Sequence, residues 1–140
     1  MSWVLNTTDF DESHIQDNVG FTYIIINNLT KQRYIGKKLF HFNRTFQVKG
    51  KKKKRKVDSD WKTYYGSNKV LNDDVLRLGG DNFTRKILKL CKSKSELSYW
   101  ETYYIFTTHA LDPKSLFYNQ WVSCRINKKN LTKVEFFLSK

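Results

Sequence analysis

The feature that most constrains the fold is a pair of short apolar segments in GFTYIIINNLTKQRYIGKK, residues 20–38. β-Branched and aromatic residues dominate residues 20–27 and 33–38, and such residues are typical of strands. The polar residues NNLTK between the two segments supply turn-forming side chains. The pattern therefore predicts an antiparallel hairpin whose tip lies at residues 27–31.

Each predicted strand carries one tyrosine, Tyr23 or Tyr34, and the pair Lys37 and Lys38 follows the second one. Side chains on the same face of paired strands lie within about 5 Å of one another, so the hairpin would bring two phenol groups together beside two ammonium groups. A neighbouring positive charge favours phenolate and would lower the tyrosine pKa, which is one way to make a base that activates water. On residue types alone, two core tyrosines beside a solvated lysine pair remain the alternative.

Two helices and a third strand are predicted after the hairpin. The segment GSNKVLNDDVLRLGG offers Ser67 or Asn68 as a helix cap and ends in two glycines, which is typical of a helix. Residues 82–91 predict a strand, and Ser93 with Glu96 forms a capping-box pattern at the start of a second helix. The order ββαβα indicates an α+β fold with a small three-stranded antiparallel sheet flanked by helices.

A long basic insertion follows the second predicted strand. Its centre is KGKKKKRK, residues 49–56, and we expect no regular element inside such a charge run. The insertion as a whole therefore predicts a loop. The resulting organisation is an N-terminal, loosely attached arm at residues 1–19, one domain at residues 20–122 that contains the insertion at residues 39–60, and a basic C-terminal extension at residues 123–140.

The charge of the chain indicates a polyanionic partner. The 26 Lys and Arg residues exceed the 13 Asp and Glu residues, for a net charge of +13, and no acidic residue lies between Asp17 and Asp58. Nucleic acid is the usual partner of such a chain. No apolar run approaches the roughly 18 residues of a membrane span, the start lacks a signal-peptide pattern, and Cys91 and Cys124 predict neither a disulfide scaffold nor a zinc site.

The chain resembles the GIY-YIG nuclease family around the two tyrosines. The second motif is intact as YIG at residues 34–36, whereas residues 21–23 read FTY and the glycine stands at Gly20. The resemblance extends further to the free-standing Seg-type endonucleases of large phages. It includes YIGKK, the lysine-rich insertion, DWKTYYGS, LCKSKSELSYWE and YNQW, and covers residues 20–122.

The resemblance implies a phage-type DNA endonuclease, in a homing or competitor-DNA-cleaving role, that uses one divalent cation, Mg²⁺ or alternatively Mn²⁺. The family's metal ligand is a glutamate on the helix after the third strand, and Glu101 is the matching residue. Its spacing from Leu97 and Ile105 places it on the sheet-facing side of that helix. A buried carboxylate is costly unless it is paired or coordinated, and a salt bridge to a lysine is the alternative interpretation.

The resemblance also implies roles for the hairpin residues. Tyr34, or Tyr23 through it, would deprotonate or position the attacking water. Lys37 would clamp the phosphate or hold the tyrosine as phenolate. Positive charge on the developing negative oxygens is a general requirement of phosphodiester cleavage.

Two further catalytic positions are less clearly matched. Arg44 corresponds by spacing to an arginine that the family places on the helix after YIG, but Lys69 is the better equivalent if the insertion precedes that helix. Tyr65 would supply the family's later active-site tyrosine, and Asn119 resembles its late polar residue.

The predicted DNA contacts come mostly from the insertion. Each of its Lys and Arg side chains could neutralise a phosphate, which adds affinity without sequence information. A solvated flexible loop is the alternative. The residues predicted to contact DNA are Lys38, Lys51, Lys52, Lys53, Lys54, Arg55, Lys56, Ser67, Lys69 and Asn119.

Two rival functions belong to other classes. One is a catalytically inactive nucleic-acid-binding module, and the other is a structural or inhibitor protein that docks on an acidic partner. The joint presence of Tyr23, Tyr34, Lys37 and Glu101 favours the nuclease. Its partner would be double-stranded DNA, with no membrane, in the cytoplasm of an infected bacterial host. A chain with one site must act twice, or form a homodimer alone or on DNA, to cut both strands.

Overall fold

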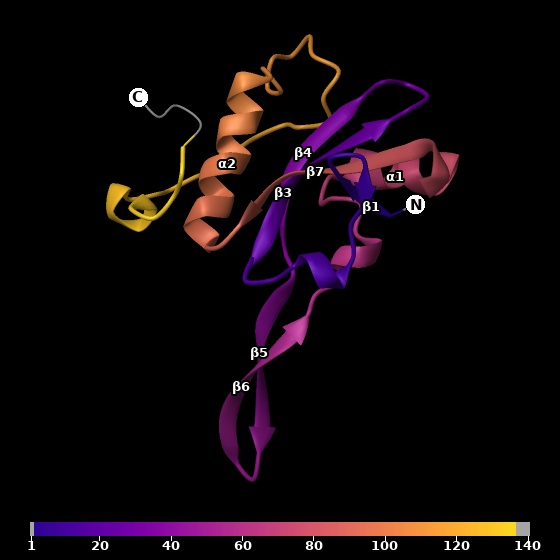
Figure 1. The fold of residues 1–140 in the computed structure, drawn as a ribbon. Helices are drawn as coiled ribbons and strands as arrows, with labels where there is room; N and C mark the ends of the chain where they lie inside the picture. The colour runs from indigo at the N-terminus through magenta and orange to yellow at the C-terminus, as the bar shows by residue number, and fades with distance from the viewer. Residues whose placement is uncertain (1, 137–140) are drawn as a thin grey trace.

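A five-stranded sheet lies at the centre of the computed structural model, which describes residues 2–136 (Figure 1). A separate two-stranded sheet projects from it, and two α-helices complete the mixed α+β fold. The elements are β1 (Trp3–Leu5), β2 (Thr8–Asp9), β3 (Gly20–Asn27), β4 (Arg33–Leu39), β5 (His41–Val48), β6 (Lys51–Asp58), α1 (Lys69–Leu78), β7 (Phe83–Cys91) and α2 (Lys94–Thr107), with short 3-10 turns at Glu12–His14, Trp61–Thr63, Gly80–Asn82 and Lys128–Leu131.

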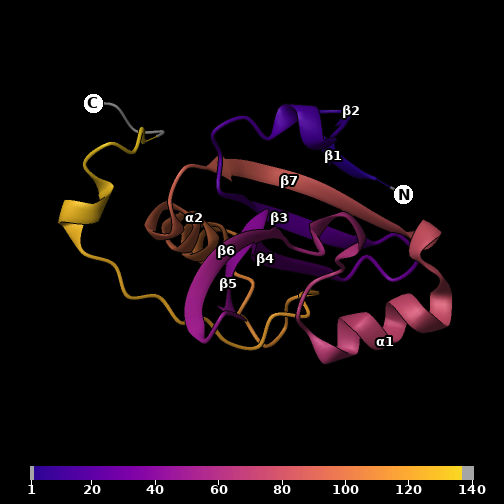
Figure 2. The same ribbon diagram turned by 90° about the horizontal axis from the view of Figure 1, so that it is seen from below.

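The main sheet has the strand order β2-β1-β7-β3-β4 (Figure 2). β3 pairs antiparallel with both β4 and β7, so the predicted hairpin and third strand are confirmed. β1 runs parallel to β7 and carries the sheet beyond the three strands that we predicted. Alternate residues of β3, namely Phe21, Tyr23 and Ile25, enter one core cluster with Leu71 of α1. Residues of α2 pack on the opposite face.

The prediction of a loosely attached N-terminal arm is wrong for the first strand. The Trp3 side chain is 1% exposed, and its ring lies 4.9 Å from that of Phe21 and 5.1 Å from that of Tyr23. Its indole nitrogen Nε1 donates a hydrogen bond of 2.6 Å to the Trp61 carbonyl. Burial of this large ring holds β1 in the sheet. The mostly polar sequence around Trp3 gives no local sign of that burial.

Both predicted helices are confirmed together with their caps. The Asn68 side chain accepts a hydrogen bond of 2.9 Å from the Leu71 amide at the start of α1. Ser93 Oγ accepts one of 3.1 Å from the Glu96 amide at the start of α2. The Glu96 carboxylate accepts a hydrogen bond of 2.7 Å from the Lys92 amide, rather than from the Ser93 amide that a standard capping box would use. Neither helix has the length and apolar composition of a membrane span, as far as the described residues extend.

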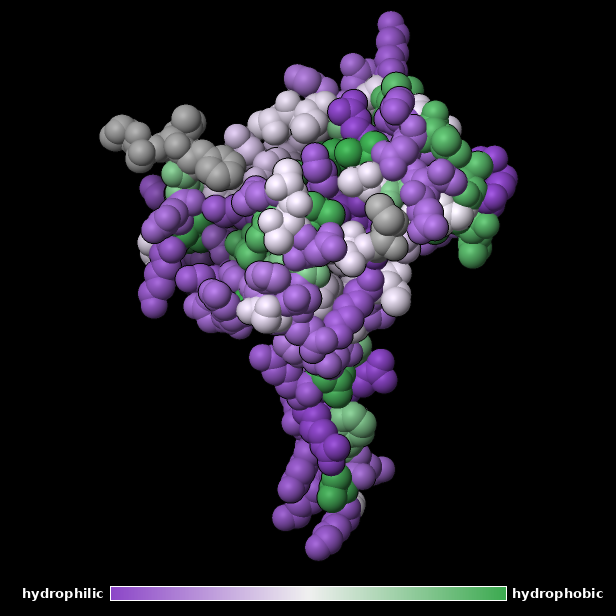
Figure 3. Space-filling model, turned by 45° about the vertical axis from the view of Figure 1, so that its right-hand side comes forward, coloured by the Kyte–Doolittle hydropathy of each residue, from purple (hydrophilic) through white to green (hydrophobic). Residues whose placement is uncertain are grey.

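The prediction of an unstructured loop at residues 39–60 is wrong. β5 and β6 pair in full register as an antiparallel ribbon, which we call the basic ribbon (residues 41–58). It projects from the body of the protein in Figures 1 and 3. Its turn at Lys49 and Gly50 has positive φ at both residues, +52° and +76°, as favoured hairpin turns require.

The alternation of strand residues explains why a charge run can form this ribbon. Successive side chains point to opposite faces, so neighbouring lysines of β6 diverge from one another. Phe42 and Phe46 share one face, where Arg44 stacks over the first ring and Arg55 over the second, each at 5.0 Å. The local packing outweighs the like charges that led us to predict a loop.

The predicted basic C-terminal extension is described only to residue 136. Phe136 packs its ring 5.2 Å from that of Tyr99 on α2. The last four residues of the predicted extension lie outside the described residues.

The packing of Trp3 leads to a first prediction. Trp3→Ala should lower the free energy of unfolding by about 3–5 kcal/mol, because a fully buried aromatic side chain leaves a cavity. Urea unfolding followed by circular dichroism measures the change. Trp121→Ala is the matched control, since Trp121 is 74% exposed and its removal should cost no more than about 0.5 kcal/mol. Equal costs for the two variants would contradict the role assigned to β1.

Candidate active site

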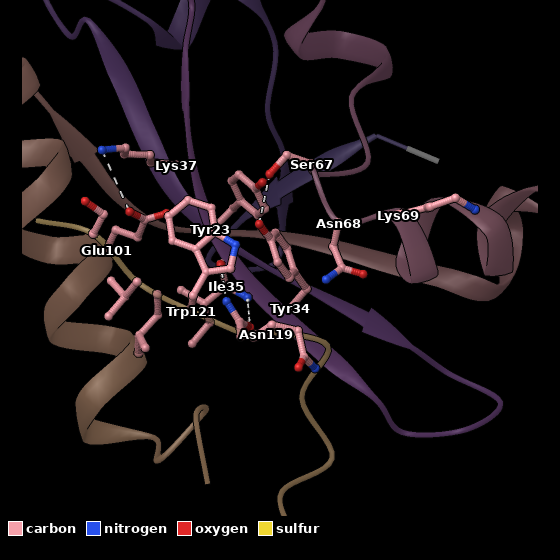
Figure 4. A pocket seen from close by; sticks show the side chains of 14 residues that line it. Tyr23, Tyr34, Ile35, Lys37, Ser67, Asn68, Lys69, Glu101, Asn119 and Trp121 are labelled. Carbon is pink, nitrogen blue, oxygen red and sulfur yellow. Dashed lines mark hydrogen bonds and ion pairs between the residues drawn. The ribbon is translucent and has the colours of Figure 1, made fainter. Parts of the chain in front are cut away.

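A cavity of about 430 Å³ opens beside β4, the edge strand of the main sheet (Figure 4). Its wall is formed by β4, the start of α1, the middle of α2 and residues 119–123. These segments are far apart in the sequence, and the sheet brings them together. The wall contains seven of the residues predicted to be functional: Tyr23, Tyr34, Lys37, Ser67, Lys69, Glu101 and Asn119.

The ring of Tyr23 lies across Gly36 on the neighbouring strand. The two residues are cross-strand partners, and a Cβ atom added at Gly36 would overlap the Tyr23 hydroxyl. Tyr23 is 1% exposed, and its ring lies 6.3 Å from Tyr34 and 6.1 Å from Tyr64. The glycine of YIG is therefore required by a tyrosine on the other strand, which links the two motifs physically.

Tyr34 presents its hydroxyl to the cavity. Its Oη lies 3.0 Å from Ser67 Oγ (Figure 4). Burial raises the pKa of Tyr34 above its ordinary value, and the nearby Tyr64 and Glu101 add to the rise, while the Ser67 hydrogen bond opposes it. Burial, followed by the influence of Tyr64 and Tyr34, raises the pKa of Tyr23 well above its ordinary value.

The structure therefore does not support the predicted lowering of the tyrosine pKa, since burial raises the pKa of both tyrosines. The predicted lowering of the pKa required lysine charge beside the phenols. Lys37 instead points to the other face of β4, as the alternation of Tyr34 and Lys37 along the strand dictates. Its Nζ donates a hydrogen bond of 2.8 Å to Ser98 Oγ on α2.

Glu101 projects from α2 toward the sheet, as its spacing predicted. Its side chain is 16% exposed, and its Oε1 lies 3.8 Å from Lys37 Nζ, at the long end of an ion pair. Burial raises the pKa of this carboxyl, and the charge of Lys37 acts in the opposite direction. A carboxylate so placed is incompletely neutralised and faces the cavity, so it is available to a cation.

Lys69, the first residue of α1, lies in the cavity wall, and Arg44 does not. Arg44 belongs to the basic ribbon, where it pairs with Arg55 and stacks on Phe42. Of the two matches for the family's arginine, Lys69 is therefore the one that the fold brings to the cavity. The Lys69 ammonium lies 2.9 Å from the Asp73 carboxylate one turn further along the helix.

Tyr65 and Lys38, both predicted to be functional, lie outside the cavity wall. The Tyr65 ring lies 4.3 Å from the Arg85 guanidinium carbon, and its hydroxyl lies against Gly80. Its neighbour Tyr64 is the tyrosine that packs against Tyr23. Lys38 is largely neutralised, because its Nζ lies 2.6 Å from an Asp60 carboxylate oxygen and 3.9 Å from the centre of the Tyr64 ring.

Asn119 covers the outer edge of β4 at Ile35, and both residues are buried. Its Oδ1 accepts a hydrogen bond of 3.0 Å from the Ile35 amide, and its Nδ2 donates one of 2.9 Å to the Ile35 carbonyl. The side-chain amide thereby replaces a further strand. Both polar ends of Asn119 are occupied, so the predicted DNA contact would require one of these bonds to break.

Residues 3–122 match a family model described as "Putative endonuclease segE, GIY-YIG domain". The match covers most of the chain and includes β1. The chain belongs to this GIY-YIG family. The resemblance seen in the sequence is thus confirmed, and family membership supports an endonuclease. No curated protein and no solved structure matches the chain.

The GIY-YIG cavity also contains residues that the sequence reasoning did not predict as functional. Trp121 is 74% exposed, yet it lines the cavity together with Glu101 and Tyr23 (Figure 4). Ser98 anchors Lys37 from α2. A large aromatic ring two residues after Asn119 was the available signal for Trp121, whereas a lone serine gives no signal of this kind.

The two hydrogen bonds between Asn119 and Ile35, which we call the clamp on β4, lead to a second prediction. Asn119→Ala should lower the free energy of unfolding by about 1–3 kcal/mol, because two backbone groups of Ile35 lose their partners. Hydrogen exchange at the Ile35 amide should accelerate. Gln120→Ala is the control, because Gln120 is exposed and adjacent in sequence. A Gln120 effect as large as that of Asn119 would contradict the clamp.

Proposed function

We propose that this protein is a metal-dependent endonuclease that hydrolyses phosphodiester bonds of double-stranded DNA in the cavity beside β4. The observation that carries the proposal is that acidic, basic and phenolic side chains line the same cavity. A half-buried carboxylate (Glu101), an ammonium group (Lys37) and a phenol (Tyr34) line a single cavity, and Lys69 borders it at the start of α1. Phosphodiester hydrolysis needs a positioned water and positive charge near the phosphate oxygens.

The residues present fit one Mg²⁺ or Mn²⁺ ion held largely by water and substrate. Glu101 is the only acidic residue of the cavity wall, and nowhere in residues 2–136 do three or more His, Cys, Asp or Glu side chains gather to hold a metal. Magnesium commonly keeps several waters and binds through one or two carboxylates plus substrate phosphates. When bound, the cation would stabilise negative charge on the phosphate oxygens.

The protein's own side chains have separate tasks in this proposal. Tyr34, whose raised pKa keeps it protonated, orients the attacking water through its hydroxyl and shares a hydrogen bond with Ser67. Lys37, held by Ser98, binds a phosphate oxygen from one face of β4. Lys69 binds the phosphate from the start of α1, where the unpaired amides of a helix N-terminus also favour an anion. Tyr23 positions β4 through its contact with Gly36.

The biological setting belongs to the same proposal. A phage-encoded nuclease of this kind would meet its DNA in the bacterial cytoplasm. Because one cavity cuts one strand, a double-strand break would need two successive cuts or a homodimer on the DNA. The exposed lysines of the basic ribbon supply phosphate contacts that hold the duplex.

Glu101→Gln should abolish Mg²⁺-dependent nicking of supercoiled plasmid, because the amide is a poor ligand for a hard cation. DNA affinity measured by gel shift in EDTA should hold or rise, since one negative charge is removed. Glu96→Gln is the matched control on the same helix, because its remaining carbonyl oxygen can still accept from the Lys92 amide. A Glu101→Gln rate within a few-fold of the original would show that Glu101 is not the ligand.

Tyr34→Phe should lower the single-turnover cleavage rate by about 10²-fold, the scale expected when a reacting group is misplaced. The ring packing survives, so the melting temperature and the DNA affinity should stay close to those of the original protein. Tyr99→Phe removes a hydroxyl outside the cavity and serves as the control. If the lost activity follows a lower melting temperature, Tyr34 is a packing residue only.

A further inference from the structure

The basic ribbon has two chemically different faces. Cross-strand pairing runs without a break from His41 opposite Asp58 to Val48 opposite Lys51, so alternation assigns each side chain to one face. We call the first the aromatic face, formed by Phe42, Arg44, Phe46, Val48, Lys51, Lys53, Arg55 and Val57. The second is the polar face, formed beyond the root of the ribbon by Asn43, Thr45, Gln47, Lys52, Lys54 and Lys56. At the root, His41 and Asp58 lie on the same side as the polar face and contact each other, with His41 Nε2 3.0 Å from an Asp58 carboxylate oxygen.

The aromatic face packs on itself. Its two arginines stack on its two phenylalanines at 5.0 Å, and Figure 3 shows apolar side chains along one side of the otherwise hydrophilic projection. An isolated two-stranded hairpin is marginally stable in water. This face therefore has a structural task, which is to stiffen the ribbon.

The polar face has no such task. Within residues 2–136, none of its six side chains forms a hydrogen bond or an ion pair. Its three cross-strand pairs, 43 with 56, 45 with 54, and 47 with 52, each set one neutral hydrogen-bonding side chain opposite a lysine. Lysines alone would suffice to bind phosphate. Neutral amides and hydroxyls are the groups that base edges require.

We propose that the polar face of the basic ribbon reads base edges in the major groove of B-form DNA. The inference rests on the proposed function only in taking duplex DNA as the substrate. The groove is about 12 Å wide and admits a two-stranded ribbon. Asn43 and Gln47 are suited to the N6 and N7 atoms of adenine, the lysines to O6 and N7 of guanine, and the Thr45 methyl group to that of thymine.

The spacing along the ribbon matches the spacing of base pairs. Same-face residues of an antiparallel strand are about 6.8 Å apart, which equals about two base-pair steps of 3.4 Å. Asn43 and Gln47 therefore lie about four base-pair steps apart along a groove. The polar face would read about five base pairs, with an adenine preferred near each end.

The ribbon is placed to meet a duplex that occupies the cavity. It starts two residues after β4. At its root, Phe42 of the aromatic face borders a depression shared with Lys37 of the cavity and with Ser98, which anchors that lysine. Two-stranded ribbons twist strongly, so the polar face changes direction toward the tip. In Figure 1 the two strands cross one another in projection.

The test is binding selection from a randomised duplex library with the full chain, in EDTA so that no DNA is cut. The original protein should enrich a short motif. The double variant Asn43→Ala with Gln47→Ala keeps every charge, so its affinity for random duplex and its salt dependence should be unchanged. Its affinity for the selected duplex should fall about tenfold or more, the scale expected when one or two bidentate base contacts are removed.

A pair of charge-matched variants separates the two faces. Lys52→Ser with Lys54→Ser alters the polar face, and Lys51→Ser with Lys53→Ser alters the aromatic face of the same strand. Both should flatten the log–log salt dependence of binding by about 0.9 for each phosphate that is no longer neutralised. Only the polar-face pair should also change the selected motif.

Several outcomes would overturn the proposal: no enriched motif, the same motif after the Asn43 and Gln47 substitutions, or an equal change from the aromatic-face pair. Equal affinity for duplex RNA would do the same, because the deep, narrow major groove of A-form RNA excludes side chains. Plasmid cleavage measured in parallel keeps the two proposals distinct. Cleavage without base preference counts against the ribbon alone, and base preference without cleavage counts against the nuclease alone.

Discussion

The contact between the Tyr23 ring and Gly36 is the constraint on which the rest of the site depends. Tyr23 is fully enclosed, with Trp3 on one side at 5.1 Å and Tyr64 on another at 6.1 Å. Its hydroxyl occupies the space that a side chain at residue 36 would fill. Any larger residue there would push the ring out of the core or β4 away from β3. The aromatic core and the position of β4 are therefore set together.

The edge position of β4 lets one short strand supply two kinds of chemistry. Tyr34 and Lys37 point to opposite faces, so in most sheets they would never meet the same ligand. Within residues 2–136, the outer side of β4 is paired only by a bridge between Arg33 and Phe117 and by the Asn119 side chain, so the cavity can wrap around the rest of the edge and reach both. An exposed edge normally offers unpaired backbone groups, and Asn119 occupies those of Ile35. Under the proposed function, a phosphate at this edge would meet the phenol from one face and the ammonium from the other.

The parts of the structure that could be predicted from the sequence are those encoded locally. The hairpin, α1, β7, α2 and the inward direction of Glu101 follow from periodicity and capping residues within a few positions. Trp3 could not be placed, because its partners Phe21 and Trp61 are distant in sequence. The basic ribbon was misjudged for a different reason: the alternation of Phe42 and Phe46 was visible, but the charge run was given more weight. Tyr64 and Tyr65 are adjacent, and periodicity alone does not say which one faces Tyr23.

Most of the net positive charge lies in the basic ribbon, whereas the candidate catalytic side chains line the cavity. Within the cavity wall the charges of the two lysines are partly offset by Glu101 and by the Asp73 partner of Lys69, so under the proposed function the cavity itself would attract DNA only weakly over distance. The basic ribbon holds eight Lys and Arg residues and one Asp, a net charge of +7 out of the +13 of the whole chain. Charges are screened beyond about 8–10 Å at physiological salt, whereas eight strand residues extend about 26 Å. Only a projecting element can carry positive charge that far beyond the core, so the stiffness provided by Phe42 and Phe46 is what makes the charge of the ribbon effective.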